Sequence, residues 1–359
     1  MTYRFSEYES LGHKRTLLFL VCMFFSSHPV LANEISASVI YDHSQILNSN
    51  NDQQSIDRAL FVLAYERQIT RKTKLHIEAQ AFRGDNGAEI VGDLQVFSNI
   101  DESDFSRLYE VWIESLFLDD SLRVKVGKID ANTEFAFADS ASEFINSSMG
   151  FSPTIAFLPT YPTPTLGALA SVKTGQANQL VFGAFSDESQ EFENVFSIVE
   201  YQLNRLSWQV KFGLWSYSGD VTSVDSQTIE SSTEGAYATV ENDLAWPVFN
   251  VQSARWFFQL GLSDGDYSEI EMHYGAGVML QGFGARTLDS AGIGVTHITT
   301  SNLRGSELPS SETSIEFFYR YTLNDYLALK PNIQYIRSPA AIAEGKNTWV
   351  ATLRAELSW

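Results

Sequence analysis

The sequence predicts an all-β fold, a transmembrane antiparallel β-barrel. Three observations predict this fold. Apolar and polar residues alternate with a period of two in segment after segment, polar or glycine-containing turns separate the segments, and no apolar run after residue 32 is long enough for a membrane helix. At about 20 residues per strand with its loop, residues 33–359 would give roughly 16 strands, a size that leaves an open interior.

The first element, residues 1–32, is predicted to be a secretory signal peptide. A basic pair precedes an unbroken apolar run over residues 17–25, and a small residue, Ala32, offers a cleavage site. The apolar run is far shorter than the roughly 20 residues of a membrane-spanning helix. The single cysteine, Cys22, lies in this segment, so a mature chain over residues 33–359 would have no disulfide and no zinc–cysteine site.

The strands that follow are predicted from faces of unlike polarity. In residues 75–82, leucine, isoleucine and alanine fall on one face, while histidine, glutamate and glutamine fall on the other. The same alternation recurs in residues 206–214, 271–281 and 349–359. Such strands separate two different solvents.

The connections between the strands also alternate. Short connectors at residues 70–73, 204–205 and 324–325 predict tight hairpins, and longer polar segments such as residues 218–237 lie at the other strand ends. A soluble β-sandwich or lectin alternates in the same way. Aromatic residues near segment ends, segments of about 9–11 residues and an aromatic residue closing the last strand favour the barrel.

One hairpin carries an unusual set of charges. Glu110, Trp112 and Glu114 share one face of residues 108–114, opposite Tyr109, Val111 and Ile113; Arg123 and Lys125 share a face of the next strand, opposite three apolar residues. A charge on the lipid face costs about 2–4 kcal/mol at the bilayer midplane. We therefore expect the charged faces to point inward.

The composition excludes several functions. A formal net charge of −20 argues against nucleic acid as a partner, because phosphate binding needs a basic surface. An outer-membrane hydrolase is the alternative enzyme, but the histidines after residue 32 accompany no nucleophile-elbow motif. No enzyme activity, cofactor or metal is predicted.

Several blocks of the chain together resemble the carbohydrate-selective outer-membrane porins of the OprB type. The blocks are residues 92–101 (GDLQVFSNID), 107–115 (RLYEVWIES), 122–136 (LRVKVGKIDANTEFA), 143–168 (EFINSSMGFSPTIAFLPTYPTPTLGA) and 327–339 (LALKPNIQYIRSP). The chain departs from the family pattern at Val96, where a glycine is expected, at Thr163, where an aspartate is usual, and at Trp359, which replaces phenylalanine.

The resemblance implies a porin of 16 strands in the Gram-negative outer membrane that admits small sugars by passive diffusion, without ATP or cofactor. Its implied partners are sugars as solutes, outer-membrane lipid, periplasmic chaperones and the barrel-insertion machinery, and it would be a monomer or a homotrimer. One alternative is a general or weakly cation-preferring diffusion porin without a sugar site, and another is a soluble sugar-binding protein.

The resemblance also implies an inward-folded constriction loop in the irregular run of residues 133–164, whose prolines cannot occupy central strand positions. The other interpretation is a solvent-facing loop. The residues expected to line or border the narrow zone are Glu110, Trp112, Glu114, Arg123, Lys125, Lys128, Asp130, Asn132, Glu134 and Tyr161, with Asn146 as a further hydrogen-bonding group of the loop. Alternatively, the charges only form a lattice that stiffens the wall.

Overall fold

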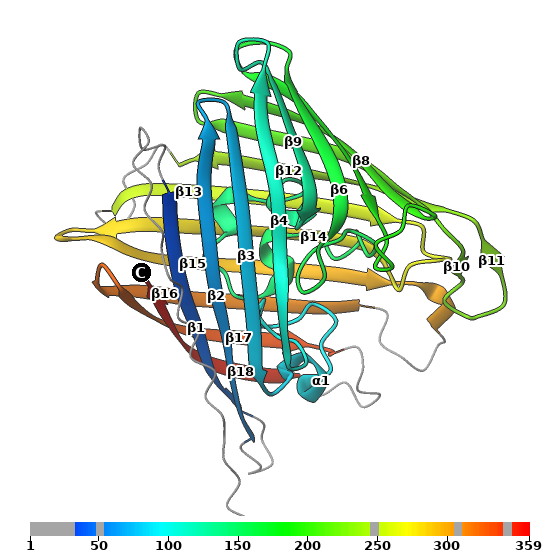
Figure 1. Cartoon of the computed structure of the whole chain (residues 1–359). Coiled ribbons are helices and arrows are strands. Elements are labelled where there is room, and N and C mark those ends of the chain that lie inside the picture. Colours follow the sequence, from blue (N-terminus) through cyan, green and yellow to red (C-terminus); the bar gives the residue numbers. More distant parts are fainter. Residues whose placement is uncertain (1–32, 48–53, 245–250, 305–310, 340–346) are drawn as a thin grey trace, which may run out of the picture. The chain divides into compact units, whose positions relative to one another are not determined.

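Sixteen antiparallel strands form a closed barrel in the part of the chain that the structure, a computed structural model, describes: residues 33–47, 54–244, 251–304, 311–339 and 347–359 (Figure 1). The predicted signal peptide lies outside these residues. The strands are neighbours in chain order, and the first pairs with the last, so the sheet has no free edge in the barrel. The predicted all-β class and strand number are confirmed.

The elements alternate between long strands and connections of two kinds. The barrel strands are β1 (Asn33–Ile46), β2 (Gln54–Thr70), β3 (Thr73–Gly84), β4 (Phe105–Phe117), β5 (Leu122–Ile129), β6 (Thr165–Lys173), β7 (Asn178–Ser186), β8 (Val195–Arg205), β9 (Trp208–Ser218), β12 (Thr233–Asp243), β13 (Val251–Ser263), β14 (Ile270–Phe283), β15 (Arg286–Thr300), β16 (Ser311–Asn324), β17 (Leu327–Arg337) and β18 (Thr348–Ser358). A separate pair, β10 (Val221–Thr222) and β11 (Ile229–Glu230), lies in a long loop.

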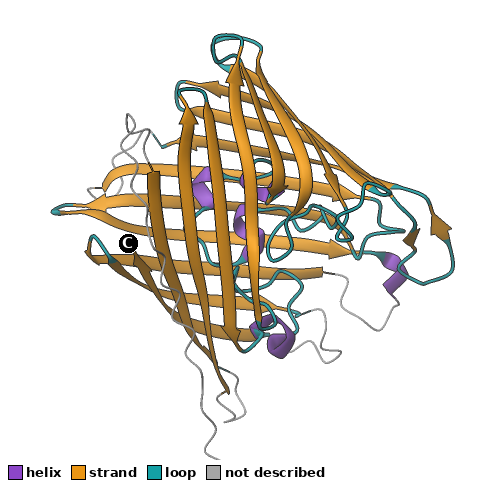
Figure 2. Cartoon of the chain, in the orientation of Figure 1, coloured by secondary structure: helices purple, strands orange, loops and turns teal. Residues whose placement is uncertain are grey.

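The helical pieces are short (Figure 2). They are α1 (Gly87–Val91), α2 (Ser147–Gly150) and the 3-10 turns η1 (Ala131–Thr133), η2 (Asp139–Ala141) and η3 (Asn302–Arg304). Among the described residues, none of the helices is long and apolar enough to cross a membrane.

The two ends of the barrel sequence meet at its closure. The backbone N–H of Trp359 donates to the carbonyl of Ala37 at 2.9 Å, and the N–H of Ala37 donates to the carbonyl of Trp359 at 3.2 Å. From there β1 and β18 stay in register along nine pairs, up to Ile46 opposite Val350. The closing strand therefore pairs along its whole length.

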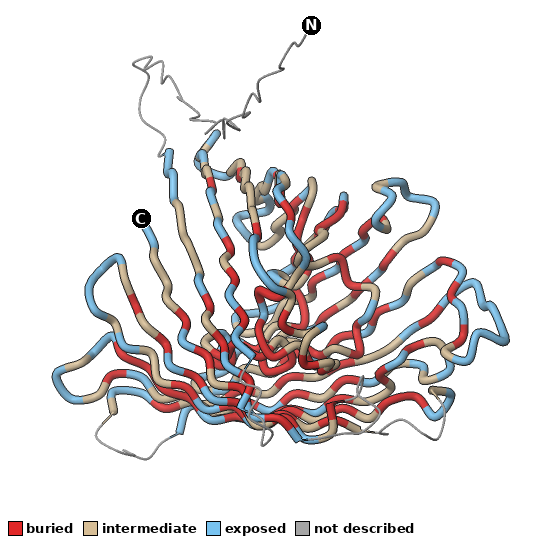
Figure 3. Tube along the Cα trace, turned by 90° about the horizontal axis from the view of Figure 1, so that it is seen from below, coloured by how far each residue is buried: buried red, intermediate tan, exposed pale blue. Residues whose placement is uncertain are grey.

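The predicted alternation appears as two faces of opposite exposure. On β5, Val126 is 53% exposed on the outer face, while Lys125 is 5% exposed on the inner one. Large exposed apolar residues such as Phe61, Phe212 and Phe317 mark the outer face of other strands, and buried polar residues mark the inner face. Figure 3 shows this change from buried to exposed along the strands. The apolar outer face is the one that lipid can cover.

Several local predictions were wrong. The β16–β17 turn lies at residues 325–326 rather than 324–325. The β8–β9 turn lies at residues 206–207 rather than 204–205, and Leu206 takes a positive φ of 51° there. Tyr109 was expected on the outer face, but it is 4% exposed. Glu78 pairs with Glu110 while Ala79 pairs with Leu108, so Tyr109 is the extra residue of a β-bulge. A bulge sets two residues against one and turns an additional side chain inward.

Candidate solute pathway

Two irregular segments fold into the barrel. The first inward segment, residues 85–104, connects β3 to β4, and the second, residues 130–164, connects β5 to β6. Their hydrogen bonds reach inner-face side chains of β1, β8, β12, β13, β16, β17 and β18. A segment that reaches strands around a closed barrel in this way lies inside it. The second segment contains the prolines, as expected for backbone that cannot join a sheet.

Buried wall carboxylates hold the backbone N–H groups of the two segments. Each of these glutamates is 0% exposed, and three of them bind two consecutive N–H groups. The contacts are Glu241 with Asp139 (2.9 Å) and Ser140 (2.5 Å), Glu316 with Ile145 (2.8 Å) and Asn146 (3.0 Å), Glu312 with Leu94 (3.0 Å) and Gln95 (3.1 Å), and Glu200 with Ala136 (2.9 Å).

Side-chain amides and ammonium groups of the wall donate hydrogen bonds to backbone carbonyls of the same segments. Gln259 donates to Ser148 (2.6 Å) and Met149 (2.7 Å), Gln334 to Phe97 (2.7 Å), Lys211 to Phe137 (2.6 Å) and Lys330 to Glu143 (3.0 Å). Buried irregular backbone needs such partners, because an unpaired buried N–H or carbonyl group is costly. The wall therefore replaces the hydrogen bonds that a sheet or water would supply.

On the opposite side, the wall holds a side chain of the second segment through cations. Arg123 bonds Glu114 at 2.9 Å and also pairs with Glu134, and Lys125 pairs with Glu134 as well. The Lys125 ammonium lies 3.9 Å from the centre of the Trp112 ring. Burial would raise the pKa of Glu134, but Arg123 and Lys125 outweigh it and hold this pKa below its usual value.

Asp130 fixes the point where the second segment leaves β5. Its carboxylate accepts from Tyr109 Oη at 2.5 Å, from Thr160 Oγ1 at 2.8 Å and from the N–H of Asn132 at 3.0 Å. Its own N–H donates to Glu110 at 2.8 Å. Burial raises the pKa of Asp130, and these hydrogen bonds oppose the rise only in part.

The first inward segment is held by ion pairs. Arg58 Nε lies 2.7 Å from Asp101, and Arg354 binds both oxygens of Asp42 at 2.7 and 2.9 Å. Ser98 donates to Asp42 at 2.7 Å. All four charged residues of this network are buried. Burial raises the pKa of Asp101 to about 7, although Arg58 opposes this rise.

A cavity of about 400 Å³ lies between the two segments. Its lining combines polar groups with aromatic rings. All lining residues belong to the two inward segments: Leu94, Gln95, Val96, Asn99, Asp101, Glu102, Asn132, Phe137, Ala141, Ser142, Phe144, Asn146, Ser147, Ser148, Gly150, Phe151, Pro153, Thr160, Tyr161 and Pro162. The Tyr161 hydroxyl donates to the Ile100 carbonyl at 2.8 Å and joins the two segments at its edge.

The structure divides the predicted site residues into three groups. Asn132, Tyr161 and Asn146 line the cavity, whereas Glu110, Trp112, Lys125, Asp130 and Glu134 are buried or nearly so and fasten the second segment to the wall. Arg123 and Glu114 are partly exposed on the inner face.

Lys128 is placed apart from the other predicted site residues. It pairs in register with Val111 and Leu166, on the outer face that also carries Val126. Its ammonium donates to the Leu108 carbonyl at 2.8 Å. The expectation that Lys128 borders the narrow zone is therefore corrected by strand parity, since it lies an even number of residues from Val126.

The sequence reasoning missed two sets of residues. The first set is the cavity lining from the first inward segment, including Asn99 and Glu102. The second set is the wall carboxylates on β8, β12 and β16. A glutamate on a polar strand face gives no sign that it binds backbone N–H groups of a distant segment. The prolines of the second segment marked it as irregular, but the first segment, residues 85–104, contains no proline.

A sequence profile described as "Carbohydrate-selective porin, OprB family" matches residues 58–221 and 220–359. No curated protein sequence matches the chain.

Among solved structures, the high-pH structure of Pseudomonas putida OprB is similar to the chain with a TM-score of 0.82 at 16% identity, covering 91% of this chain and 94% of that one. The low-pH structure of the same protein gives a TM-score of 0.61 at 17% identity, covering 91% and 92%. An anion-selective porin from Comamonas acidovorans gives a TM-score of 0.57 at 10% identity, covering 91% of this chain and 100% of that one. At these identities the structures show the shared barrel fold.

Proposed function

Because the chain belongs to the OprB family of carbohydrate-selective porins, we propose that small sugars cross its barrel through the cavity between the two inward segments. The chain is an outer-membrane β-barrel porin and not an enzyme. The proposal concerns the residues that form the passage for sugars. The observation that carries it is the cavity lining, which comes from the two segments that fill the barrel interior.

The chemistry of this lining suits a sugar. Side-chain amides of Asn99 and Asn132 can exchange hydrogen bonds with hydroxyl groups as the sugar sheds water, and the rings of Tyr161 and Phe137 offer apolar faces to a pyranose. Selectivity in a pore arises from its diameter, its donors and acceptors, and its electrostatic barriers. The second inward segment would then be the constriction loop, held at a fixed distance from the first by Tyr161.

Planar-bilayer conductance tests the proposal. Glucose, as a monosaccharide probe, should reduce the ion current through the full-length protein, and Asn132→Ala should weaken this reduction by several fold. Asn178→Ala, at the start of β7 and outside the cavity lining, is the matched control and should leave it unchanged. If no mono- or oligosaccharide reduces the current, or if both variants behave alike, sugars do not use this cavity.

A second property, weak cation preference, is favoured by the charges of the cavity. Asp101 and Glu102 line it, and none of the described lining residues is lysine or arginine. An acidic passage concentrates cations. Glu102→Gln should lower the cation-to-anion permeability ratio, measured as a reversal potential in a salt gradient, whereas Glu188→Gln in the loop after β7 should not.

The remaining proposals concern biogenesis. Cleavage after Ala32 would leave Asn33 as the first residue, and β1 begins at this residue. Periplasmic chaperones and the barrel-insertion machinery would then deliver the chain to the outer membrane, where it would be a monomer or a homotrimer. N-terminal sequencing of the purified protein tests the cleavage, and its mass in detergent tests the oligomeric state.

A further inference from the structure

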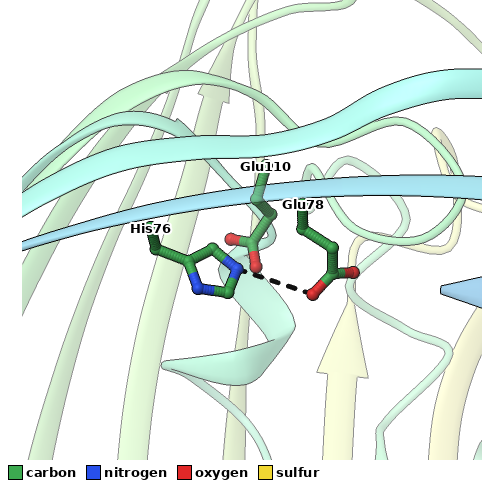
Figure 4. Close-up of side chains that lie close together, drawn as sticks. All are labelled: His76, Glu78 and Glu110. Carbon is green, nitrogen blue, oxygen red and sulfur yellow. Dashed lines mark ion pairs between the residues drawn. The ribbon is translucent and has the colours of Figure 1, made fainter. Parts of the chain in front are cut away.

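Three side chains with metal-binding atoms meet on the inner wall beside the second segment (Figure 4). His76 and Glu78 lie two residues apart on β3 and share its inner face, and Glu110 on β4 is the register partner of Glu78. One nitrogen or oxygen atom from each lies within 4.8 Å of the others. The three groups stand on paired strands, which fix their positions more firmly than a loop would.

Glu66 and Trp112 fix the orientation of the His76 ring. Its Nδ1 lies 3.1 Å from Glu66 Oε1, and the ring stacks on Trp112 with centres 4.7 Å apart. Because an ionised carboxylate only accepts hydrogen bonds, Nδ1 carries the proton, and in the neutral ring Nε2 keeps the lone pair that a metal ion would need. A carboxylate behind a histidine is the arrangement that orients metal-binding imidazoles in proteins.

The Nε2 atom is the second observation that points to a ligand. The His76 residue is 8% exposed, and Nε2 has no hydrogen-bond partner among the described residues. It points toward Glu78, with Oε2 at 3.5 Å (Figure 4). A buried nitrogen without a partner is costly. A cation between Nε2 and the carboxylates would remove this cost.

The local charges also favour a cation. Glu78 and Glu110 stand directly opposite each other, and like charges in this position destabilise a strand pair. The nearby ammonium groups are engaged elsewhere, since Lys74 lies 3.2 Å from Glu66 and Lys125 pairs with Glu134. One oxygen of each carboxylate is already fixed, by Gln80 at 2.8 Å and by the N–H of Asp130 at 2.8 Å.

We propose that His76 Nε2 and the carboxylates of Glu78 and Glu110 bind a divalent transition metal ion of the zinc class, with water completing its coordination. Ligand bonds of about 2.1 Å in a tetrahedral site put ligand atoms about 3.4 Å apart. The distance from Nε2 to Glu78 Oε2 is 3.5 Å, close to this spacing, and a ligand atom of Glu110 lies within 4.8 Å of the other two. An imidazole ligand selects zinc over magnesium and calcium, which prefer all-oxygen sites.

The site is coupled to the second inward segment. The Glu110 carboxylate would bind the metal, and its Oε1 also accepts a hydrogen bond from the N–H of Asp130. The second inward segment leaves β5 at Asp130. Occupancy of the site therefore changes the charge and the rigidity at the root of the segment. Zinc bound in the barrel wall would therefore alter the properties of the channel, although His76, Glu78 and Glu110 do not line the cavity proposed for solutes.

Titration of the full-length protein in detergent with Zn²⁺ alone tests the proposal. One ion per chain should bind, and His76→Gln and Glu78→Gln should each weaken binding at least tenfold. His297→Gln, which removes a histidine on the outer face of β15, is the matched control and should leave binding unchanged. Heat-dependent gel migration checks that each variant still forms a closed barrel.

Two further readouts separate a metal site from a simple ion pair. Co²⁺ should give visible absorption bands that His76→Gln changes in position, whereas Glu66→Gln, which removes only the positioning carboxylate, should weaken binding and retain the bands. If Zn²⁺ binds no more tightly than Mg²⁺, or if His76→Gln leaves Zn²⁺ binding intact, His76 is not a ligand and serves as a charged partner of Glu66 and Glu78. Either result overturns the proposal.

Discussion

The second inward segment is held by two different kinds of contact with the barrel wall. In the first kind, wall cations bind a carboxylate of the segment: Arg123 and Lys125 on β5 pair with Glu134, and Lys330 on β17 pairs with Glu143. In the second kind, wall carboxylates such as Glu316 on β16 bind backbone N–H groups of the segment. The first arrangement depends on side chains of both partners, and the second depends on the side chain of the wall alone.

The difference between these contacts shows how a strongly acidic chain can fill the interior of its own barrel. Backbone N–H groups are donors that every residue except proline supplies, so wall glutamates can fasten a segment of almost any sequence. Ion pairs are more specific, but protonation of the carboxylate abolishes them. The two kinds of contact should therefore respond differently to substitution and to pH.

The largest effect is expected from Glu316→Ala. This change leaves the N–H groups of Ile145 and Asn146 and the amide of Asn332 without their buried acceptor, at a cost of about 3 kcal/mol or more. The midpoint of urea unfolding in vesicles should fall, and single-channel conductance should rise as the segment loosens. Glu316→Gln keeps one accepting oxygen, so its unfolding midpoint and its conductance should lie between those of the wild type and Glu316→Ala. An unchanged conductance in Glu316→Ala would contradict this account of the wall.

A smaller effect is expected from Glu134→Gln on the β5 side. The loss of two ion pairs should cost about 1.5–3 kcal/mol, since hydrogen bonds to charged groups contribute about this much. The pKa of Glu134 is held below its usual value by Arg123 and Lys125, which outweigh burial. Its stabilising effect is therefore complete above the unfolded pKa of about 4.3 and is lost as the pH falls through the lower folded pKa.

Conductance at decreasing pH measures this dependence. The wild-type channel should become noisier and more conductive below about pH 4, while Glu134→Gln should behave this way at every pH. Glu188→Gln, in the loop after β7, is the charge-matched control. A wild-type channel that is equally stable from pH 3 to pH 7 would show that the cations on β5 do not hold the segment.

The first inward segment should respond to pH with the opposite sign. Burial, followed by the charges of Glu312 and Asp101, raises the pKa of Asp93. Burial likewise raises the pKa of Asp101 to about 7. An acid with a raised folded pKa stabilises the fold most at low pH, and this stability falls as the pH rises from about 3.9 to 7.

Asp93→Asn tests that sign. The variant keeps the shape of the side chain without its charge, so at pH 8 it should be more stable than the wild type, with a flatter pH dependence of the unfolding midpoint. Asp225→Asn, in the loop that carries β10 and β11, should not change either quantity. A wild-type stability that rises with pH between 4 and 7 would contradict the expectation.

The smallest effect is expected at Val96. Its φ of 52° lies in the left-handed region, which a β-branched residue rarely adopts. The resemblance led us to expect a glycine here, and the backbone conformation gives a physical reason for that expectation. Val96→Gly should raise the unfolding midpoint by the equivalent of about 0.5–1 kcal/mol, whereas Val96→Ala should gain less because it keeps most of the strain.

Much of the candidate site could be predicted from the sequence where side chains act on one another. The alternation in β5 placed Arg123 and Lys125 inward, and their partner Glu134 lies nine residues beyond Lys125. The bulge at Tyr109 could not be predicted, because an extra residue in a strand leaves the polarity pattern almost unchanged. Lys128 shows the converse error, since its charge suggested the inner face although its parity placed it outside.

The sequence by itself determined the barrel, because the period-two alternation states which face of each strand meets lipid. The chain length indicated the number of strands, and the resemblance of several sequence blocks indicated the porin family. Only the tertiary structure decided what fills the barrel. The contacts of Glu241 and Glu316 join residues more than one hundred positions apart to backbone groups that have no sequence signature. The meeting of His76, Glu78 and Glu110 likewise depends on strand register, which side-chain identity alone does not specify.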